Sequence, residues 1–245
     1  MSNTSHRKIH VSVVMPVYNE EEIIEKTVRD YHSEIVRSLP GSEMIIVNDC
    51  STDSTPMILD RLAAELEGIK VITPPRNGGH GKALRLAYEN AAKSLVFHTD
   101  SDYQLDPKDF WKLYEETGAN DLVIGCRAVR HDPLPRLVIT GILRLSNIVL
   151  FGYDLRDANS PFRSIKKECL DACLGIIPPD VFAPSIMLAV TARRMGYKVK
   201  EVPVTHLPRL TGEVSIRRWK LLKACMTSLH QNYELRKKLG GIARG

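Results

Sequence analysis

The segment Val96–Gln104 has the sequence VFHTDSDYQ, in which a short apolar run ends in two carboxylates, Asp100 and Asp102. If the chain stayed extended, this spacing would place both side chains on one face, where they could approach one hard cation. Mg²⁺ and Mn²⁺ prefer oxygen ligands and typically link protein carboxylates to the phosphates of a substrate. Taken alone, the spacing is more often a solvated turn with two acids, so the surrounding sequence has to decide between the two interpretations.

The same order of an apolar run followed by polar residues occurs twice upstream, after Val11–Val17 and after Met44–Val47. The polar residues that follow these runs are Tyr18, Asn19, Glu20, Asn48, Asp49, Ser51 and Asp53. If all three runs are strands of one parallel sheet, their polar ends meet at one edge, where ligands of such folds bind. The recurrence therefore favours a nucleotide pocket over a solvated turn.

Helical patterns separate the apolar runs. We predict one helix capped by Asn19, a second from Thr55 to Gly68 with a proline in its first turn, and a third from about Lys82 to Lys93. The remaining strands are expected at Val71–Thr73, Leu95–Phe97 and Leu122–Ile124. This alternation predicts an α/β fold, a Rossmann-like, mostly parallel sheet with helices on both faces in a single domain.

The glycine-rich segment Arg76–Lys82, RNGGHGK, enters the third predicted helix. It suits close backbone approach and anion contact at a helix N-terminus, and a simple tight connection explains the glycines equally well. It is not a P-loop, because the spacing and the hydroxyl residue after the lysine are missing.

Composition sets the broad class. The chain has 245 residues, of which 43% are hydrophobic and 26% charged, as expected for one globular domain. The formal charge is +5, and basic residues are dense over 127–163 and 193–238, where they can face phosphates or an anionic membrane. Five scattered cysteines, without a CxxC pair or partner histidine spacing, predict neither a disulfide framework nor a zinc site and fit a reducing cytosol.

Membrane attachment is expected to be peripheral at most. The segment Leu137–Phe151 is too short to span a bilayer and is interrupted by Arg144, so it is either an amphipathic helix on a membrane or isoprenoid tail or an ordinary core helix. The segment Ile216–Leu239 fits interfacial docking, dimer contact or packing on the domain. Because no secretory signal is visible, we expect a cytoplasmic location, with peripheral attachment to the cytoplasmic face of a membrane as one option.

Six blocks occur in an order that resembles family 2 glycosyltransferases of the GT-A fold. They are VVMPVYNE, VNDCSTDST, RNGGHGKALRLAYENA, DSDYQ, DANSPFR and EVPVTHLPRLTGEVS. Within that family they are most similar to the polyprenyl-phosphate (dolichyl-phosphate) mannose and glucose synthases. Two residues depart from the pattern: Asn48 stands where an acid is usual, and Pro161 stands where many relatives have glycine. The resemblance covers roughly residues 10 to 220 and implies a GT-A domain at 10–215. We expect a tail at 1–9 and, from the residue pattern, a basic amphipathic C-terminal helix and tail at 216–245.

The resemblance also implies roles for individual residues. The nucleotide sugar would be bound by Pro16, Tyr18, Glu20, Asp49, Lys82, Asp100 and Ser101. Mg²⁺ or Mn²⁺ would be held on the pyrophosphate by Asp100, Asp102 and Gln104. Asp102 and Asp157 would be the catalytic residues, with Asp157 on the acceptor side.

The acceptor decides what Asp157 has to do. A hydroxyl acceptor requires a general base, whereas a phosphate monoester is already largely ionised near neutral pH because its second pKa is ~6. For a phosphate, Asp157 would position the acceptor or the metal, and an ion pair with Arg156 or Arg163 is the purely structural alternative. A phosphate acceptor also requires cations, for which we expect Arg127, Arg144, Arg163 and Arg209.

The resemblance, together with the metal and phosphate patterns, implies an inverting, metal-dependent transfer of one hexose from a nucleotide sugar of the GDP-mannose or UDP-glucose class to a polyprenyl phosphate. The expected partners are this donor, this acceptor, and a membrane surface or a membrane-anchored protein. Transfer to a saccharide or protein hydroxyl and a non-catalytic nucleotide-sugar-binding protein are the alternatives. Nucleic-acid binding is disfavoured, because no aromatic platform is interleaved with the basic stretches.

Overall fold

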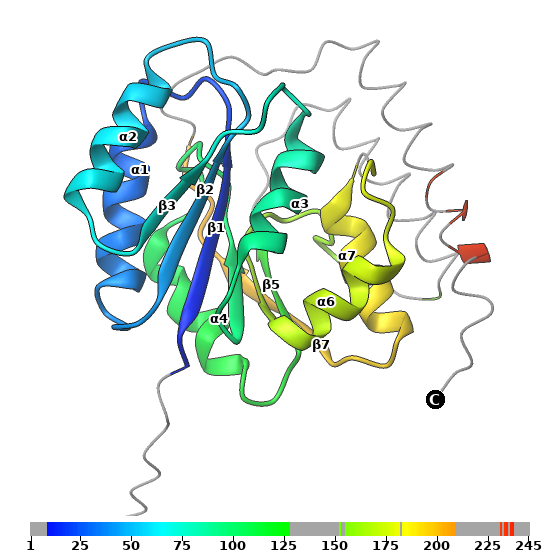
Figure 1. Cartoon of the computed structure of the whole chain (residues 1–245). Helices are drawn as coiled ribbons and strands as arrows, with labels where there is room; N and C mark the ends of the chain where they lie inside the picture. The colour runs from blue at the N-terminus through cyan, green and yellow to red at the C-terminus, as the bar shows by residue number, and fades with distance from the viewer. Residues whose placement is uncertain are drawn as a thin grey trace, which may run out of the picture.

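A computed structural model describes residues 9–127, 152, 155–181, 183–208, 231, 233–234 and 236–237 (Figure 1). Within these residues one sheet has the strand order β3-β2-β1-β4-β6-β5-β7. Its strands are β1 (Val11–Val17), β2 (Glu43–Asn48), β3 (Ile69–Ile72), β4 (Leu95–His98), β5 (Leu122–Arg127), β6 (Arg163–Lys166) and β7 (Val199–Val204). The helices are α1 (Ile24–Tyr31), η1 (His32–Val36), α2 (Thr55–Glu65), α3 (His80–Asn90), η2 (Pro107–Asp109), α4 (Phe110–Glu116), α6 (Lys167–Ile176) and α7 (Pro184–Arg194).

The sheet is mostly parallel, as the sequence predicts. β1 pairs in parallel with β2 and β4, β2 with β3, and β5 with β7. β6 is antiparallel to both β4 and β5, so it joins the two parallel parts of the sheet. The carboxyl ends of β1, β2 and β4 consequently lie at one edge.

Helices cover both faces of the sheet (Figure 1). Alternate residues of β1 point to opposite faces: Val14 belongs to the core under α3, α6 and α7, whereas Val13 and Met15 belong to the core under α1, α2 and α4. Every residue of β1 is buried, because neither face is open to solvent. This double burial explains why every residue of the strand except Ser12 is apolar.

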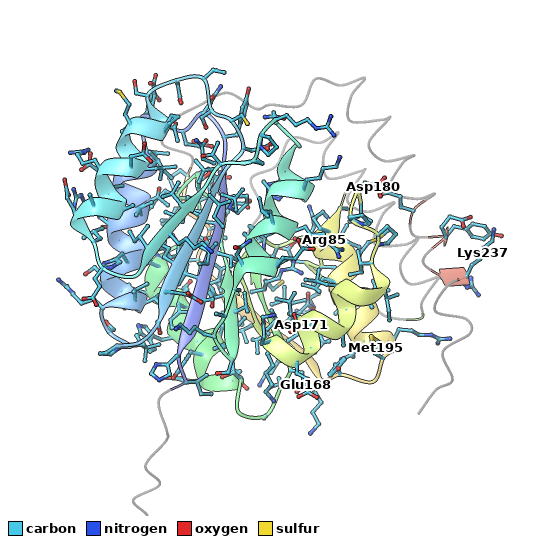
Figure 2. All side chains as sticks on the ribbon, viewed as in Figure 1. Arg85, Glu168, Asp171, Asp180, Met195 and Lys237 are labelled. Carbon is cyan, nitrogen blue, oxygen red and sulfur yellow. The ribbon has the colours of Figure 1, made fainter. Side chains whose placement is uncertain are left out.

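α3 is fixed to the second half of the chain by Arg85. Its guanidinium points toward the end of α6, where it donates to the carbonyl oxygens of Ile177 at 2.8 Å and Leu174 at 3.1 Å (Figure 2). These carbonyls lie in the last turn of α6 and at its C-cap, where helix carbonyls lack intrahelical partners. The contact holds the glycine loop before α3 in a defined place relative to the sheet.

The predicted strands are confirmed, with ends displaced by at most three residues. The predicted cap of the first helix is wrong: α1 begins at Ile24, after Ile23 as N-cap, and no side chain caps it. Asn19 instead adopts a φ of 51°, and its side-chain oxygen accepts from Thr52 N–H at 2.8 Å. Asn19 therefore contacts the loop after β2 instead of capping α1.

Segment 137–151 lies outside the described residues, and so does most of 216–245. The proposed domain boundaries stay predictions. Among the described residues, no helix combines the length and the apolar character needed to cross a bilayer.

Candidate functional site

The polar residues after β1, β2 and β4 come together, as the sequence predicts. Asp49 N–H donates to the carbonyl oxygen of Val17 at 2.9 Å, and Thr99 N–H donates to that of Val14 at 3.2 Å. Asn19 N–H donates to Ser51 Oγ at 3.0 Å. These bonds continue the parallel ladders beyond the strand ends and place the three loops side by side at one edge.

Asp49 joins the second loop to the glycine-rich segment. Its carboxylate accepts from Gly78 N–H at 2.8 Å and from Gly79 N–H at 2.7 Å, and only 3% of the residue is exposed. Asn77 Nδ2 donates to the carbonyl oxygen of Asp49 at 2.7 Å. Gly79 has a φ of +81°, which a side chain would strain, and it is the N-cap of α3. Asp49 thus fixes the loop that precedes Lys82; its contact with a base or ribose stays a prediction.

The other residues predicted on the donor side surround this junction. Pro16 is buried within β1, whereas half of Tyr18 is exposed just after the strand. Glu20 is half-buried, and its N–H donates to Thr55 Oγ1 at 2.9 Å. Lys82 is exposed in the first turn of α3, and Ser101 is buried beside Asp100. They form the border of the edge where β1, β2 and β4 end.

The loop that carries Asp100 and Asp102 is a turn. The extended conformation of β4 ends at His98, the chain bends at Ser101 and Asp102, and Tyr103 has a φ of 54°. Thr27 Oγ1 donates to the carbonyl oxygen of Ser101 at 3.1 Å, and Leu207 N–H donates to that of Gln104 at 2.8 Å. The two carboxylates are therefore presented by a folded turn anchored to α1 and to the chain after β7.

Within this turn, the residues predicted to bind a divalent cation are neighbours. Gln104 N–H donates to Asp102 Oδ1 at 3.3 Å, and both residues are half-buried. Asp100 Oδ1 is buried and has no hydrogen-bond partner among the residues that the structure describes. Buried polar atoms are normally paired, so an unpaired carboxylate oxygen fits a site for a cation. The oxygen donors of Asp100, Asp102 and Gln104 fit Mg²⁺ or Mn²⁺.

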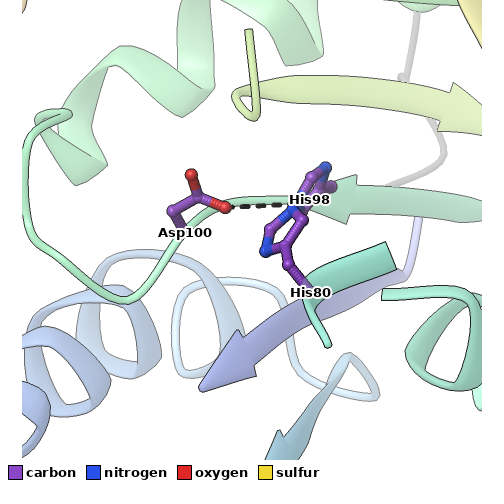
Figure 3. A group of neighbouring side chains, drawn as sticks. All are labelled: His80, His98 and Asp100. Carbon is purple, nitrogen blue, oxygen red and sulfur yellow. Dashed lines mark ion pairs between the residues drawn. The ribbon is translucent and has the colours of Figure 1, made fainter. Parts of the chain in front are cut away.

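Two histidines that the sequence analysis did not select lie next to Asp100 (Figure 3). His98 is fully buried at the end of β4; its Nδ1 is 3.1 Å from Tyr88 Oη, and its Nε2 is 3.6 Å from Asp100 Oδ1. His80 begins α3 and is exposed. The spacing of His98 two residues before Asp100 was the signal that could have found this contact.

The electrostatics of this group follow from burial. Burial lowers the pKa of His98 to about 4, so its imidazole is neutral near pH 7. Burial by itself would raise the pKa of Asp100, but the nearby His98, His80 and Arg127 lower it overall. Asp100 therefore carries a negative charge, which is what a cation ligand requires.

Asp157 and Arg127 form an ion pair on the other half of the sheet. Arg127 Nε and one terminal nitrogen donate to the two oxygens of Asp157 at 2.7 and 3.0 Å, and only 2% of Asp157 is exposed. Glu201 of β7 accepts from the N–H groups of Asp157 at 2.8 Å and of Arg156 at 3.1 Å. Asp157 is thus an ion-pair partner, but of Arg127 rather than of Arg156 or Arg163. Glu201 was not predicted, because its partner groups are backbone atoms.

Arg163 requires a correction. It was expected to face the acceptor phosphate, but it is fully buried in β6. Its guanidinium donates to the carbonyl oxygens of Ser160, Ser185 at 2.7 Å and Ala158 at 3.0 Å. These bonds use the donors that a phosphate would need, so Arg163 has a structural role. Arg144 and Arg209 lie outside the described residues.

Residues 12–169 match the family model described as "Glycosyl transferase family 2". The chain is 31% identical to "Glycosyltransferase AglD" of Haloferax volcanii over 86% of its own length and 35% of that protein. It is 27% identical to "Undecaprenyl-phosphate 4-deoxy-4-formamido-L-arabinose transferase" of Pseudomonas aeruginosa, over 89% and 65% of the two chains. The chain thus spans about a third of the first relative's length and just under two thirds of the second's.

A third relative is covered more fully. "Undecaprenyl-phosphate mannosyltransferase" of Micrococcus luteus is 27% identical, over 84% of this chain and 86% of that protein. Among solved structures, a mannosyltransferase from Pyrobaculum calidifontis in complex with GDP-Man and Mn²⁺ has a TM-score of 0.63 and 21% identity, over 94% and 70% of the two chains. Glucosyl-3-phosphoglycerate synthase from Mycobacterium tuberculosis has a TM-score of 0.69 and 22% identity, over 91% and 80%. At these identities the solved structures show the shared GT-A fold.

Proposed function

Because this chain belongs to glycosyl transferase family 2, we propose that it transfers one hexose from a nucleotide sugar to a polyprenyl phosphate, with inversion and with Mg²⁺ or Mn²⁺. The names of two relatives include undecaprenyl phosphate, which supports this choice of lipid. The sugar and the base stay open between the GDP-mannose and UDP-glucose classes. Peripheral contact with a membrane, or with a membrane-anchored partner, is part of the proposal.

The observation that carries the proposal is an incompletely bonded carboxylate at the carboxyl ends of the parallel strands. Asp100 presents a buried oxygen without a hydrogen-bond partner among the described residues. The ion pair of Arg127 and Asp157, at the end of β5, lies at the same edge of the sheet, because β4 and β5 are both antiparallel to β6. This edge offers oxygen ligands for a metal-bound diphosphate and, at Arg127 and Asp157, charged groups that can position an acceptor.

On the donor side, Asp100, Asp102 and Gln104 would hold the divalent cation. When bound, this cation supplies positive charge that stabilises the leaving nucleoside diphosphate. The glycine loop, fixed by Asp49, and Tyr18, Glu20 and Lys82 would position the nucleotide. These residues bind and orient the donor, and none of them has to form a covalent bond to the sugar.

On the acceptor side, a phosphate oxygen would attack the anomeric carbon as the bond from that carbon to the diphosphate oxygen breaks. The attack on the opposite face inverts the configuration. Because the acceptor oxygen is already ionised, no proton has to be removed. Both carboxylate oxygens of Asp157 accept from Arg127, which favours a positioning role for Asp157 over that of a general base.

The experiment supplies the protein with radiolabelled nucleotide sugars, Mn²⁺ and three acceptors: polyprenyl phosphate, polyprenol and a soluble saccharide. We expect an organic-extractable, acid-labile product with polyprenyl phosphate alone. EDTA should abolish its formation, and added Mg²⁺ or Mn²⁺ should restore it. Salt-sensitive binding to anionic liposomes, measured by flotation, would support peripheral attachment.

Two results would count against the proposal. Full activity in EDTA would show that transfer does not require Mg²⁺ or Mn²⁺. Equal transfer to polyprenol or to the saccharide would contradict the proposal that the acceptor is a lipid phosphate. Asp157 would then have to act as general base. An Asp157→Asn variant distinguishes these roles, because a positioning residue affects the KM for the acceptor more than a base does.

A further inference from the structure

His80, His98 and Asp100 form a cluster (Figure 3). Its two imidazoles are not among the ligands proposed for Mg²⁺ or Mn²⁺. The ligand atoms of the three residues all lie within 4.8 Å of one another. His98 Nε2 and Asp100 Oδ1 are buried, face each other at 3.6 Å, and lack hydrogen-bond partners among the described residues. Two buried polar atoms that face each other beyond hydrogen-bond distance indicate a position for a shared ligand.

The geometry resembles that of a transition-metal site. In a tetrahedral zinc site the ligand atoms lie roughly 3.4 Å apart, given the usual bond lengths to nitrogen and oxygen. The 3.6 Å between His98 Nε2 and Asp100 Oδ1 is close to that value. His80 is exposed at the start of α3, so its side chain can rotate by the small amount needed to join them.

The surroundings of His98 also fit a metal ligand. Its Nδ1 is engaged by Tyr88 Oη at 3.1 Å, which leaves Nε2 as the atom that faces Asp100. A hydrogen bond at the other ring nitrogen is the usual means by which proteins orient a ligating histidine. Tyr88 and His98 are both buried and their rings meet edge to face, so the imidazole is held in this orientation.

We propose that His80, His98 and Asp100 form a second cation site, selective for a borderline metal such as Zn²⁺ or Co²⁺, which shares Asp100 with the oxygen site for Mg²⁺ or Mn²⁺. Imidazole nitrogens favour zinc and cobalt, whereas the oxygens of Asp102 and Gln104 favour magnesium and manganese. Because one carboxylate serves both sites, the two classes of cation compete. The pattern of cysteines predicted no zinc site, and the site proposed here contains no cysteine.

Competition has a functional consequence that rests on the proposed function. A zinc ion held by His80 and His98 would draw Asp100 away from the donor complex and inhibit transfer. The site would therefore be inhibitory toward an enzyme that works with Mg²⁺ or Mn²⁺. Binding of the metal itself does not depend on any activity, so it is tested separately.

The experiment measures binding of Zn²⁺ by calorimetry and of Co²⁺ by its visible absorption, using the metal-free full chain. We expect one ion per chain and a tetrahedral cobalt spectrum. His80→Ala should weaken binding of both ions at least about tenfold. In the same variant, Mn²⁺ binding, followed by the loss of its free paramagnetic resonance signal, should change less than about twofold, since the oxygen set is intact.

His10→Ala is the matched control, because His10 is also exposed but lies before β1, at the opposite end of that strand from the site. This variant should bind Zn²⁺ as the unmodified chain does. Equal zinc affinity in His80→Ala, or simultaneous binding of Zn²⁺ and Mn²⁺ without competition, would overturn the proposal. Absent Mn²⁺ binding with intact zinc binding would instead count against the oxygen site of the proposed function.

Discussion

Asp49 follows β2 and Asp100 follows β4, the two strands that flank β1. Their carboxylates differ in how many hydrogen bonds they accept. Both oxygens of Asp49 accept from backbone N–H groups, at 2.8 and 2.7 Å. Asp100 Oδ1 is buried without a hydrogen-bond partner among the described residues, and His98 Nε2 lies 3.6 Å from it. The fully bonded carboxylate stabilises the loop architecture, and the incompletely bonded one is available to a ligand.

The difference shows how one edge can be both rigid and reactive. Buried polar atoms have hydrogen-bond partners in the part of the edge that supports the fold. At the proposed metal site, one buried oxygen lacks a hydrogen-bond partner among the described residues. Stability should therefore respond more strongly to changes at Asp49 than to changes at Asp100. Three substitutions test this contrast, in order of expected effect.

The largest effect is expected for Asp100→Asn. Transfer to polyprenyl phosphate should fall by at least about 100-fold, because a charged oxygen of the metal site is lost. The free energy of unfolding in metal-free buffer should change by less than about 1 kcal/mol, because Oδ1 gives up no hydrogen bond to a described residue. Initial rates and urea denaturation measure the two quantities. Parallel loss of activity and stability would mean that Asp100 is structural, like Asp49.

Asp49→Ala should cost stability, unlike Asp100→Asn. The free energy of unfolding should fall by about 2–3 kcal/mol, because the N–H groups of Gly78 and Gly79 lose their acceptors. Asp49→Asn is the matched control; it keeps one acceptor oxygen and should lose about half as much. Urea denaturation at fixed pH measures both variants. Unchanged stability in Asp49→Ala would refute the view that this carboxylate holds the glycine loop.

The smallest effect is expected for Tyr103→Phe. The Tyr103 hydroxyl donates to Asp30 Oδ2 at 2.6 Å, and Lys26 Nζ lies 3.9 Å from the centre of the ring. Phenylalanine keeps the cation–π contact and removes only the hydroxyl, so the loss should be about 0.5–1 kcal/mol. Thermal denaturation is sensitive enough for this difference. A larger loss would show that the turn after β4 depends on one hydrogen bond rather than on several.

The fold was predictable because its main signals are local. The run Val11–Val17 is continuous in the sequence since both faces of β1 are covered, and it was predicted to the residue. The cap at Asn19 failed for a tertiary reason: Asn19 bonds to Thr52, in the loop after the next strand. Propensity cannot detect such a partner.

The site was only partly predictable for a similar reason. Arg127 and Arg163 looked alike as cations near a phosphate, yet one forms a partly exposed ion pair and the other is buried among carbonyl oxygens. Burial of a charged residue depends on strand order, here on β6 lying between β4 and β5. His80 and His98 were missed because they are 18 positions apart in the sequence. They come together only when α3 packs beside β4 in the fold.

The ion pair of Arg127 and Asp157 also has a consequence for how this chain can evolve. It joins two residues 30 positions apart, one ending β5 and the other tied to β7 through Glu201. The pair therefore connects the carboxyl end of β5 to a residue that is itself bonded to β7, the parallel neighbour of β5. Removing one partner of a buried ion pair leaves the other charge uncompensated, which is strongly destabilising. We therefore expect Arg127 and Asp157 to be replaced together rather than singly as the sequence diverges.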